Sequence, residues 1–179
     1  MILFLKKTKH PLTLFKDALF FLFLAQSFFI HSQTKVKNDD FNNMLQSLLK
    51  HSVTEVNPNQ INLNSDIIIL DSREKEEYNV SHIPNAKWIG YETFNSGNLN
   101  NIPKDSKIIV YCTVGYRSEK TAEKLIKLGY TNVSNLYGGI FEWIHSGKKI
   151  ISDSITKNVH TYNKEWSKWL NKNSANAIY

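Results

Sequence analysis

The part of this chain best suited to chemistry is the stretch from Cys112 to Ser118, with the sequence CTVGYRS. It holds the only cysteine of the protein, and an arginine follows it within the same stretch. Residues 107–111 form a short, largely apolar run rich in β-branched side chains, which predicts a buried strand. Residues 118–128 have helical spacing, and Gly129 marks the end of that helix. The cysteine is therefore expected on a tight loop between a strand and a helix.

Such a loop favours a reactive thiol. Its backbone amides and the N-terminus of the following helix present partial positive charge to the sulfur, and this favours the thiolate over the thiol. The thiolate is the nucleophilic form of cysteine. A buried structural cysteine is the alternative, since lone cysteines are often buried. The position of Cys112 favours the nucleophile.

The rest of the pattern indicates which elements position this loop. Apolar strand candidates recur along the chain and alternate with helical patterns. The strands are expected at 53–56, 67–70, 86–89, 107–111 and 133–136, and the helices at 40–50, 74–79, 118–128 and 139–146. This alternation predicts an α/β fold with a mainly parallel central sheet and helices on both faces. Ligands of such sheets bind beyond the carboxyl ends of the strands, where Cys112 lies.

Two extensions flank this core pattern. Residues 33–52 combine a polar leader with an amphipathic helix, which Asp39 or Asp40 is expected to cap. Residues 94–106, inside the core pattern, are rich in Asn, Ser, Gly and Pro and predict a loop. The C-terminal extension, residues 150–179, has aromatic and apolar residues at helical spacing: Tyr162, Trp166, Trp169 and Leu170. We expect an aromatic helix that docks on the domain, with a partner-binding face as the alternative.

The first 32 residues have the features of a targeting segment. Four lysines, the last of them Lys16, form a basic leader, and residues 18–30 form an apolar block. That block is short for a membrane span but suits the core of a secretory signal peptide. A retained N-terminal anchor is the alternative. We expect an exported protein of the periplasm or cell envelope, with no stable membrane association once the signal is cleaved.

Charge and cysteine content narrow the range of functions. The formal net charge is +6, and about half of it lies in the leader. The remainder forms no clustered basic stripe, so we expect no nucleic-acid partner. One cysteine excludes an internal disulfide, and in an exported protein such a residue is reactive or pairs with another molecule. His145 and His160 have no metal-ligand spacing with other donors, so we predict neither a metal site nor a cofactor.

Four motifs, found in order within residues 53–149, resemble those of the rhodanese family of sulfurtransferases. Residues 71–78 (DSREKEEY) resemble the family element D-x-R-x-x-x-E-[YF], and residues 82–86 (HIPNA) resemble G-H-I-P-G-A. Residues 112–118 fit the active-site pattern C-x-x-G-x-R-S. Residues 129–143 contain G-[YF], then L-x-G-G, then a tryptophan. The resemblance implies a rhodanese-like domain of the α/β class over residues 53–149.

Two positions depart from the family pattern. Ser81 and Asn85 stand where the family usually has glycine. Asparagine is the non-glycine residue best suited to a left-handed backbone. The departures therefore put only the local turn geometry in doubt.

The resemblance also implies a mechanism. The family transfers sulfur by double displacement, with the residue matching Cys112 as the nucleophile that carries the sulfur as a persulfide. Loop amides would cradle the terminal sulfur, and a glycine would let the backbone turn close to it. The predicted substrate-binding residues are Thr113, Val114, Gly115, Tyr116, Arg117, Ser118 and Arg73. The partners would be a small-molecule or protein sulfur donor, such as thiosulfate or a persulfide, and a thiophilic acceptor.

Four neighbouring side chains have more specific expectations. Arg117 is predicted to hold an anionic donor such as thiosulfate, with an ion pair to Glu77 or Asp71 as the alternative. For Arg73 the preference is reversed, and bracing of the surroundings through hydrogen bonds is favoured over donor binding. We expect Asp71 to cap a helix rather than act as an acid, and His82 to be structural.

Three other functions compete with sulfur transfer. A rhodanese-like phosphatase has five residues between its cysteine and arginine, whereas four separate Cys112 from Arg117, a cradle better suited to sulfur than to phosphate. A non-catalytic rhodanese module that binds a partner typically lacks the cysteine. A thiol-redox role in the envelope would use the same residues and stays open.

Val114 and Tyr116 give the loop an apolar edge. This favours a larger persulfide or protein donor over thiosulfate.

Overall fold

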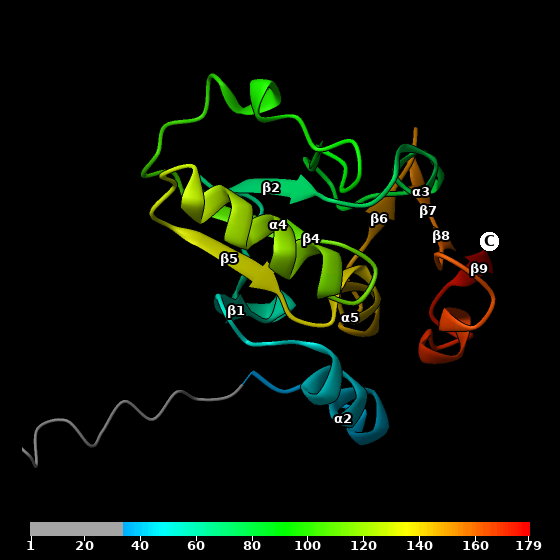
Figure 1. Cartoon of the computed structure of the whole chain (residues 1–179). Coiled ribbons are helices and arrows are strands. Elements are labelled where there is room, and N and C mark those ends of the chain that lie inside the picture. The colour runs from blue at the N-terminus through cyan, green and yellow to red at the C-terminus, as the bar shows by residue number, and fades with distance from the viewer. Residues whose placement is uncertain (1–33) are drawn as a thin grey trace, which may run out of the picture. The chain divides into compact units, whose positions relative to one another are not determined.

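The computed structural model describes residues 34–179, so the predicted leader, residues 1–32, lies outside the described residues. A five-stranded sheet in the order β1-β5-β4-β2-β3 is the centre of this part (Figure 1). Its strands are β1 (Thr54–Val56), β2 (Ile68–Asp71), β3 (Lys87–Trp88), β4 (Ile108–Tyr111) and β5 (Val133–Leu136). Every neighbouring pair is parallel, which confirms the predicted α/β class.

Helices cover both faces of the sheet, and the alternation of side chains along the strands explains why. Along β4, Ile109 and Tyr111 belong to one buried cluster, and Ile108 and Val110 belong to another. The helices are α2 (Asp39–Leu48), α3 (Lys75–Val80), α4 (Tyr116–Lys127) and α5 (Gly139–His145). The first cluster includes residues of α2 and α5, and the second includes residues of α4. Both faces are therefore buried, as a parallel sheet requires.

The four helices predicted between residues 40 and 146 are confirmed, with differences of one or two residues at their ends. Helix α4 begins two residues earlier than its apolar pattern, at Tyr116. Helix α2 is capped by Asn38, whose side chain accepts a 2.8 Å hydrogen bond from the Phe41 amide, so the expected cap at Asp39 or Asp40 is wrong. Both aspartates lie in the first turn instead, where negative charge complements the helix dipole. The predicted loop 94–106 includes a 3₁₀ turn, η2 (Ser96–Leu99), and a further turn, η1 (Pro58–Gln60), follows β1.

The C-terminal extension does not form the predicted aromatic helix. It contains two small sheets, one of β6 (Ile150–Ile151) and β7 (Ile155–Thr156), the other of β8 (Asn158–His160) and β9 (Asn176–Ile178). Between β8 and β9 lies one 3₁₀ turn, η3 (Trp166–Trp169). Backbone pairing between β8 and β9 holds the two ends of this segment together, and η3 is the helical turn assigned between them.

The docking of the extension is nevertheless as expected from its aromatic residues. Trp166 and Trp169 pack against the larger buried cluster, and Leu170 belongs to it. The rings of Trp169 and Phe41 have centroids 5.8 Å apart, so the extension also contacts α2. Within residues 34–179, no helix combines the length and the apolar character needed to cross a membrane.

Candidate active site

Cys112 lies directly after β4, at the carboxyl end of a central strand, as the sequence predicts. Its side chain is almost fully buried, with 1% of the residue exposed. The amide of Gly115 donates a 3.2 Å hydrogen bond to Sγ. Gly115 has φ +118°, a conformation that side-chain-bearing residues rarely adopt, and it forms the N-cap of α4. The glycine therefore lets the loop turn an amide back onto the sulfur.

A buried asparagine of β5 holds the turn at Gly115 in place through hydrogen bonds. Asn135 Nδ2 donates a 3.0 Å hydrogen bond to the carbonyl of Gly115, and Asn135 Oδ1 accepts one of 2.7 Å from Ser118 Oγ. Ser118 Oγ also lies 3.5 Å from Cys112 Sγ. The sequence prediction missed Asn135. Its signal was a polar amide inside the buried apolar strand 133–136.

The second glycine-rich motif holds the other side of the loop. At the start of α5, the amide of Ile140 donates to the carbonyl of Cys112 at 2.9 Å, and that of Phe141 to the carbonyl of Thr113 at 3.3 Å. A Cβ on Gly139 would lie 2.6 Å from the Thr113 oxygen and closer still to that of Cys112. Only glycine allows this approach, so the Gly-Gly motif serves to dock α5 on the cysteine loop.

Arg117 is engaged by Glu77 of α3. Its two terminal nitrogens donate to the Glu77 carboxylate at 2.6 and 2.9 Å, and one also donates to Thr113 Oγ1 at 2.9 Å. Burial alone would raise the pKa of Glu77, but its hydrogen bonds to Arg117 and the arginine charge lower it overall. Burial alone would lower the pKa of Arg117, and the same pair raises it. Arg117 thus forms the ion pair that the sequence offered as the alternative to donor binding. A donor anion would have to compete with Glu77 for the guanidinium.

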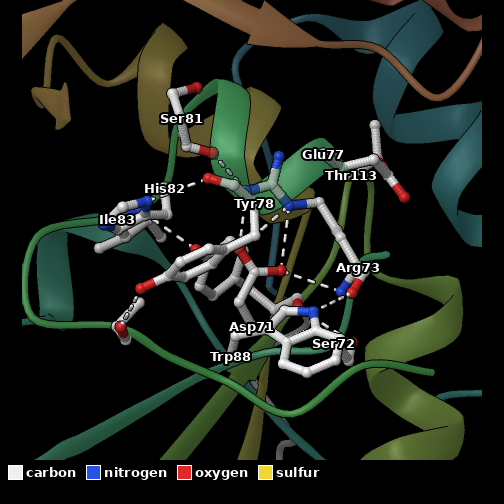
Figure 2. Close-up of polar contacts among 12 residues, drawn as sticks. Asp71, Ser72, Arg73, Glu77, Tyr78, Ser81, His82, Ile83, Trp88 and Thr113 are labelled. Carbon is white, nitrogen blue, oxygen red and sulfur yellow. Dashed lines mark hydrogen bonds and ion pairs between the residues drawn. The ribbon is translucent and has the colours of Figure 1, made fainter. Parts of the chain in front are cut away.

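Arg73, predicted among the substrate-binding residues with bracing favoured, is wholly buried and does not line the cavity above Cys112. Its Nε and one terminal nitrogen donate to Asp71, the shortest of these bonds being 2.6 Å. The same nitrogen donates to the carbonyl of Ser81 at 2.6 Å (Figure 2). These contacts join the end of β2 to the end of α3. They are the contacts of a bracing residue.

Asp71 is the centre of this buried network rather than a helix cap. It accepts hydrogen bonds from the Arg73 amide at 2.9 Å and from the Tyr111 hydroxyl (Figure 2). The cap position of α3 is Glu74 instead. Burial and the charge of Asp71 raise the pKa of Tyr111 well above its ordinary value, so the phenol stays protonated and donates. The hydroxyl also accepts from the amide of Ile83 at 3.1 Å. Strands β2 and β4 are thereby linked just before the cysteine loop.

The remaining predicted positions are structural. His82 stacks on Tyr78 with ring centroids 4.0 Å apart, and its Nδ1 lies 3.0 Å from the Tyr78 carbonyl oxygen. Asn85 has φ +66°, the left-handed backbone for which asparagine suits best, whereas Ser81 is extended. Within residues 34–179, no group of three or more His, Cys, Asp or Glu side chains could hold a metal ion. His145 contacts Glu142 within its own helix.

A cavity of about 430 Å³ lies above the cysteine loop. Of the loop residues predicted for the site, Cys112, Thr113, Val114, Tyr116 and Arg117 line this cavity, whereas Gly115 and Ser118 do not. Lining residues that the sequence prediction missed are Leu48, Glu74, Tyr91, Glu92, Tyr162 and Trp166. No local signal marks them, because tertiary packing alone brings them to the cysteine. The arrangement places the Cys112 sulfur in a cavity whose lining is largely apolar.

Comparison with known proteins agrees with this description of fold and loop. The family model described as "Rhodanese-like domain" matches residues 52–146, which is more than half of the chain. The chain belongs to the rhodanese-like domain family. Cys112 and the network around it lie inside the matched region.

Similar proteins share the domain within longer chains. A tRNA uridine(34) hydroxylase from Wigglesworthia glossinidia brevipalpis is 36% identical over 55% of this chain and 33% of its own length. An adenylyltransferase and sulfurtransferase UBA4 from Candida albicans is 28% identical over 64% of this chain and 24% of its own length. This chain thus spans a third or less of these two curated relatives.

Solved structures share the fold. The BH2092 protein of Bacillus halodurans aligns with a TM-score of 0.52 and 25% identity, covering 66% of this chain and 88% of that one. A thiosulfate sulfurtransferase from Pseudomonas aeruginosa aligns with a TM-score of 0.50 and 17% identity, covering 65% of this chain and 23% of that one. The second likeness concerns the fold alone.

Proposed function

We propose that this protein is a sulfurtransferase that carries sulfane sulfur on Cys112. The observation that carries the proposal is the position of Sγ, on the floor of the cavity with the Gly115 amide aimed at it. An amide donor at this point stabilises negative charge on sulfur, both on the attacking thiolate and on a persulfide. The name of the Candida albicans relative, which includes sulfurtransferase, is consistent with this chemistry.

The reaction divides into two displacements. In the first, the Cys112 thiolate attacks the outer sulfur of the donor, a sulfur–sulfur bond forms, and the donor leaves with the electron pair of its broken bond. Thiosulfate would leave as sulfite, and an organic persulfide would leave as a thiolate. In the second, an acceptor nucleophile attacks the outer sulfur of the Cys112 persulfide and restores the thiolate. No external oxidant or reductant is needed.

The loop is held for this cycle by three separate elements. Helix α3 contacts it through Glu77, strand β5 through Asn135, and helix α5 through the amide of Ile140. Fixed amides need no reorganisation when charge moves from one sulfur to the next. We also propose, from the sequence of residues 1–32, that the reaction takes place after export to the cell envelope.

The test is the intact mass of the protein after incubation with a sulfur donor. Wild-type protein is expected to gain the mass of one sulfur atom from thiosulfate or from an organic persulfide, and to lose it on addition of cyanide or a thiol. Cys112→Ser should gain nothing. Wild-type protein that gains no sulfur from either donor, with Cys112 still open to alkylation, would contradict the proposal. It would leave the alternative of a rhodanese module that binds a partner without transferring sulfur.

A further inference from the structure

Part of the wall of the cavity above Cys112 comes from outside the family domain. Leu48 belongs to α2, and Tyr162 and Trp166 belong to the C-terminal extension, whereas the family match covers only residues 52–146. Both extensions also pack against the larger buried cluster, so they form an ordered part of the site. Three lining residues are therefore supplied by segments that the family match does not cover.

The walls are apolar and aromatic. Six of the eleven lining residues are of this kind: Leu48, Tyr91, Val114, Tyr116, Tyr162 and Trp166. Tyr116 and Tyr162 are 42% and 53% exposed, so their rings are partly open to solvent. Aromatic side chains that keep exposed surface beside a reactive group are suited to contact an apolar ligand.

Tyr162 is held in place against its backbone preference. It has φ +68°, a left-handed conformation that is an outlier for a bulky residue. Its amide donates to His160 Nδ1 at 3.1 Å, and the Arg117 guanidinium carbon lies 5.0 Å from its ring centroid. The guanidinium therefore has Glu77 on its polar edge and an aromatic ring near its plane. Little of this cation is left for a ligand.

The charges of the cavity do not favour a dianion. Its lining contains two carboxylates, Glu74 and Glu92, and one cation, Arg117, whose charge is paired with Glu77. An approaching anion thus meets two carboxylates and no cation of the lining that lacks a carboxylate partner. The Gly115 amide can stabilise negative charge, and it is aimed at the Cys112 sulfur.

We propose that the cavity selects a sulfur donor with an apolar or aromatic body and no ionised group. Tyr162 and Trp166 are then specificity-determining residues. The donor is an alkyl or aryl hydropersulfide, R–S–SH. The Cys112 thiolate bonds to the outer sulfur, the S–S bond of the donor breaks, and R–S⁻ leaves with the electron pair, while the proton stays on the new Cys112 persulfide. This inference rests on the proposed function and narrows its donor.

The test compares two donors on matched variants. Single-turnover loading of Cys112 is measured by intact mass with benzyl hydropersulfide and with thiosulfate. Wild-type protein should favour benzyl hydropersulfide in kcat/KM. Tyr162→Asn removes the ring but keeps a residue that tolerates the left-handed backbone. It should lower kcat/KM for benzyl hydropersulfide by about tenfold and leave thiosulfate within about twofold.

Two further variants complete the comparison. Trp166→Ala should act in the same direction, and its thermal unfolding shows whether the fold is kept. Tyr179→Ala is the matched control, because Tyr179 is an aromatic residue of the same extension, 64% exposed, that does not line the cavity. This control variant should leave kcat/KM unchanged for both donors. Glu92→Gln removes one lining carboxylate and should raise kcat/KM for thiosulfate alone.

The outcomes separate this inference from the proposed function. The selection of apolar donors would be overturned if Tyr162→Asn lowered kcat/KM equally for both donors, or if wild-type protein preferred thiosulfate. Either result would leave the proposed sulfur transfer intact. A wild-type protein that takes sulfur from no donor would overturn the proposed function itself.

Discussion

The charge of Arg117 is committed within the protein before any substrate binds. Glu77 takes it in a two-point ion pair, and Glu77 also accepts from Thr113 of the cysteine loop. From the sequence, donor binding and ion pairing of Arg117 were both open, because Glu77 lies 40 positions away and only the fold brings it near. At the residue scale, the cysteine loop therefore lies beside an arginine whose charge is already neutralised by Glu77, rather than beside a cation that is free to bind an anion.

This ion pair should make the stability of the folded protein depend on pH. The pKa of Glu77 is lowered from 4.5 in the folded protein. The stability that the ionised carboxylate contributes is fully present above its unfolded pKa and is lost as pH falls through the lower folded pKa. Wild-type protein should thus lose stability faster than Glu77→Gln below a pH of 4.5. Urea unfolding at several pH values checks this, and parallel curves for the two proteins would contradict it.

Gly139 should tolerate no side chain. It has φ +58°, and an added Cβ would meet the carbonyls of Cys112 and Thr113. Gly139→Ala is expected to lower the free energy of unfolding by about 2–4 kcal/mol and to slow sulfur loading. Gly147→Ala is the control, because Gly147 has φ +76° but nothing within 4 Å of its added Cβ, so only about 1 kcal/mol is expected. Chemical denaturation of both variants measures the difference, which should vanish if contact with the loop is unimportant.

At the scale of elements, local patterns were predictable and long-range ones were not. The strand 107–111 and the helix after Cys112 follow from consecutive residues, and so did the loop between them. The C-terminal extension failed because its aromatic spacing matches a helix, while β8 pairs with β9 across 18 residues. Pairing at that distance leaves no periodic signal. The same reason explains why Leu48 and Tyr162 could not be assigned to the site.

Strand β5 should influence the cysteine loop through one side chain. Asn135→Ala leaves the Gly115 carbonyl and the Ser118 hydroxyl without their buried partner. We expect a loss of about 1–3 kcal/mol in stability and slower loading of Cys112 with every donor. Ser134→Ala, one position earlier and on the opposite face of the strand, should leave loading unchanged. Loading rates from intact mass decide this, and identical rates in both variants would remove Asn135 from the machinery.

At the scale of the whole molecule, the described chain is a family domain extended at both ends over its own active site. The matched residues 52–146 supply the nucleophile, and the flanking segments supply part of the cavity wall. The family match therefore covers the cysteine loop, whereas Leu48, Tyr162 and Trp166 of the cavity wall lie beyond it. Sequence motifs predicted the loop, and Val114 and Tyr116 favoured a larger persulfide or protein donor, but no local signal placed the flanking residues in the wall.

Export is a prediction that belongs to the complete chain. The basic leader and the apolar block of residues 18–30 predict cleavage after Ser27 or Ser32. In a Gram-negative host, full-length protein should appear in the periplasm with the mass of the shortened chain. Inhibition of signal peptidase should make the precursor accumulate. A single uncleaved species in the membrane fraction, with or without the inhibitor, would favour the retained anchor.

The burial of the Cys112 sulfur has a consequence for how the protein survives among other thiols. With 1% of the residue exposed, beside a cavity of about 430 Å³, the Cys112 sulfur should react more readily with slender reagents than with bulky ones. Iodoacetamide should therefore alkylate Cys112 faster, relative to free cysteine, than a bulky dye-linked maleimide does. The same burial should slow the formation of mixed disulfides between Cys112 and bulky thiols, while small donors of sulfane sulfur still reach it.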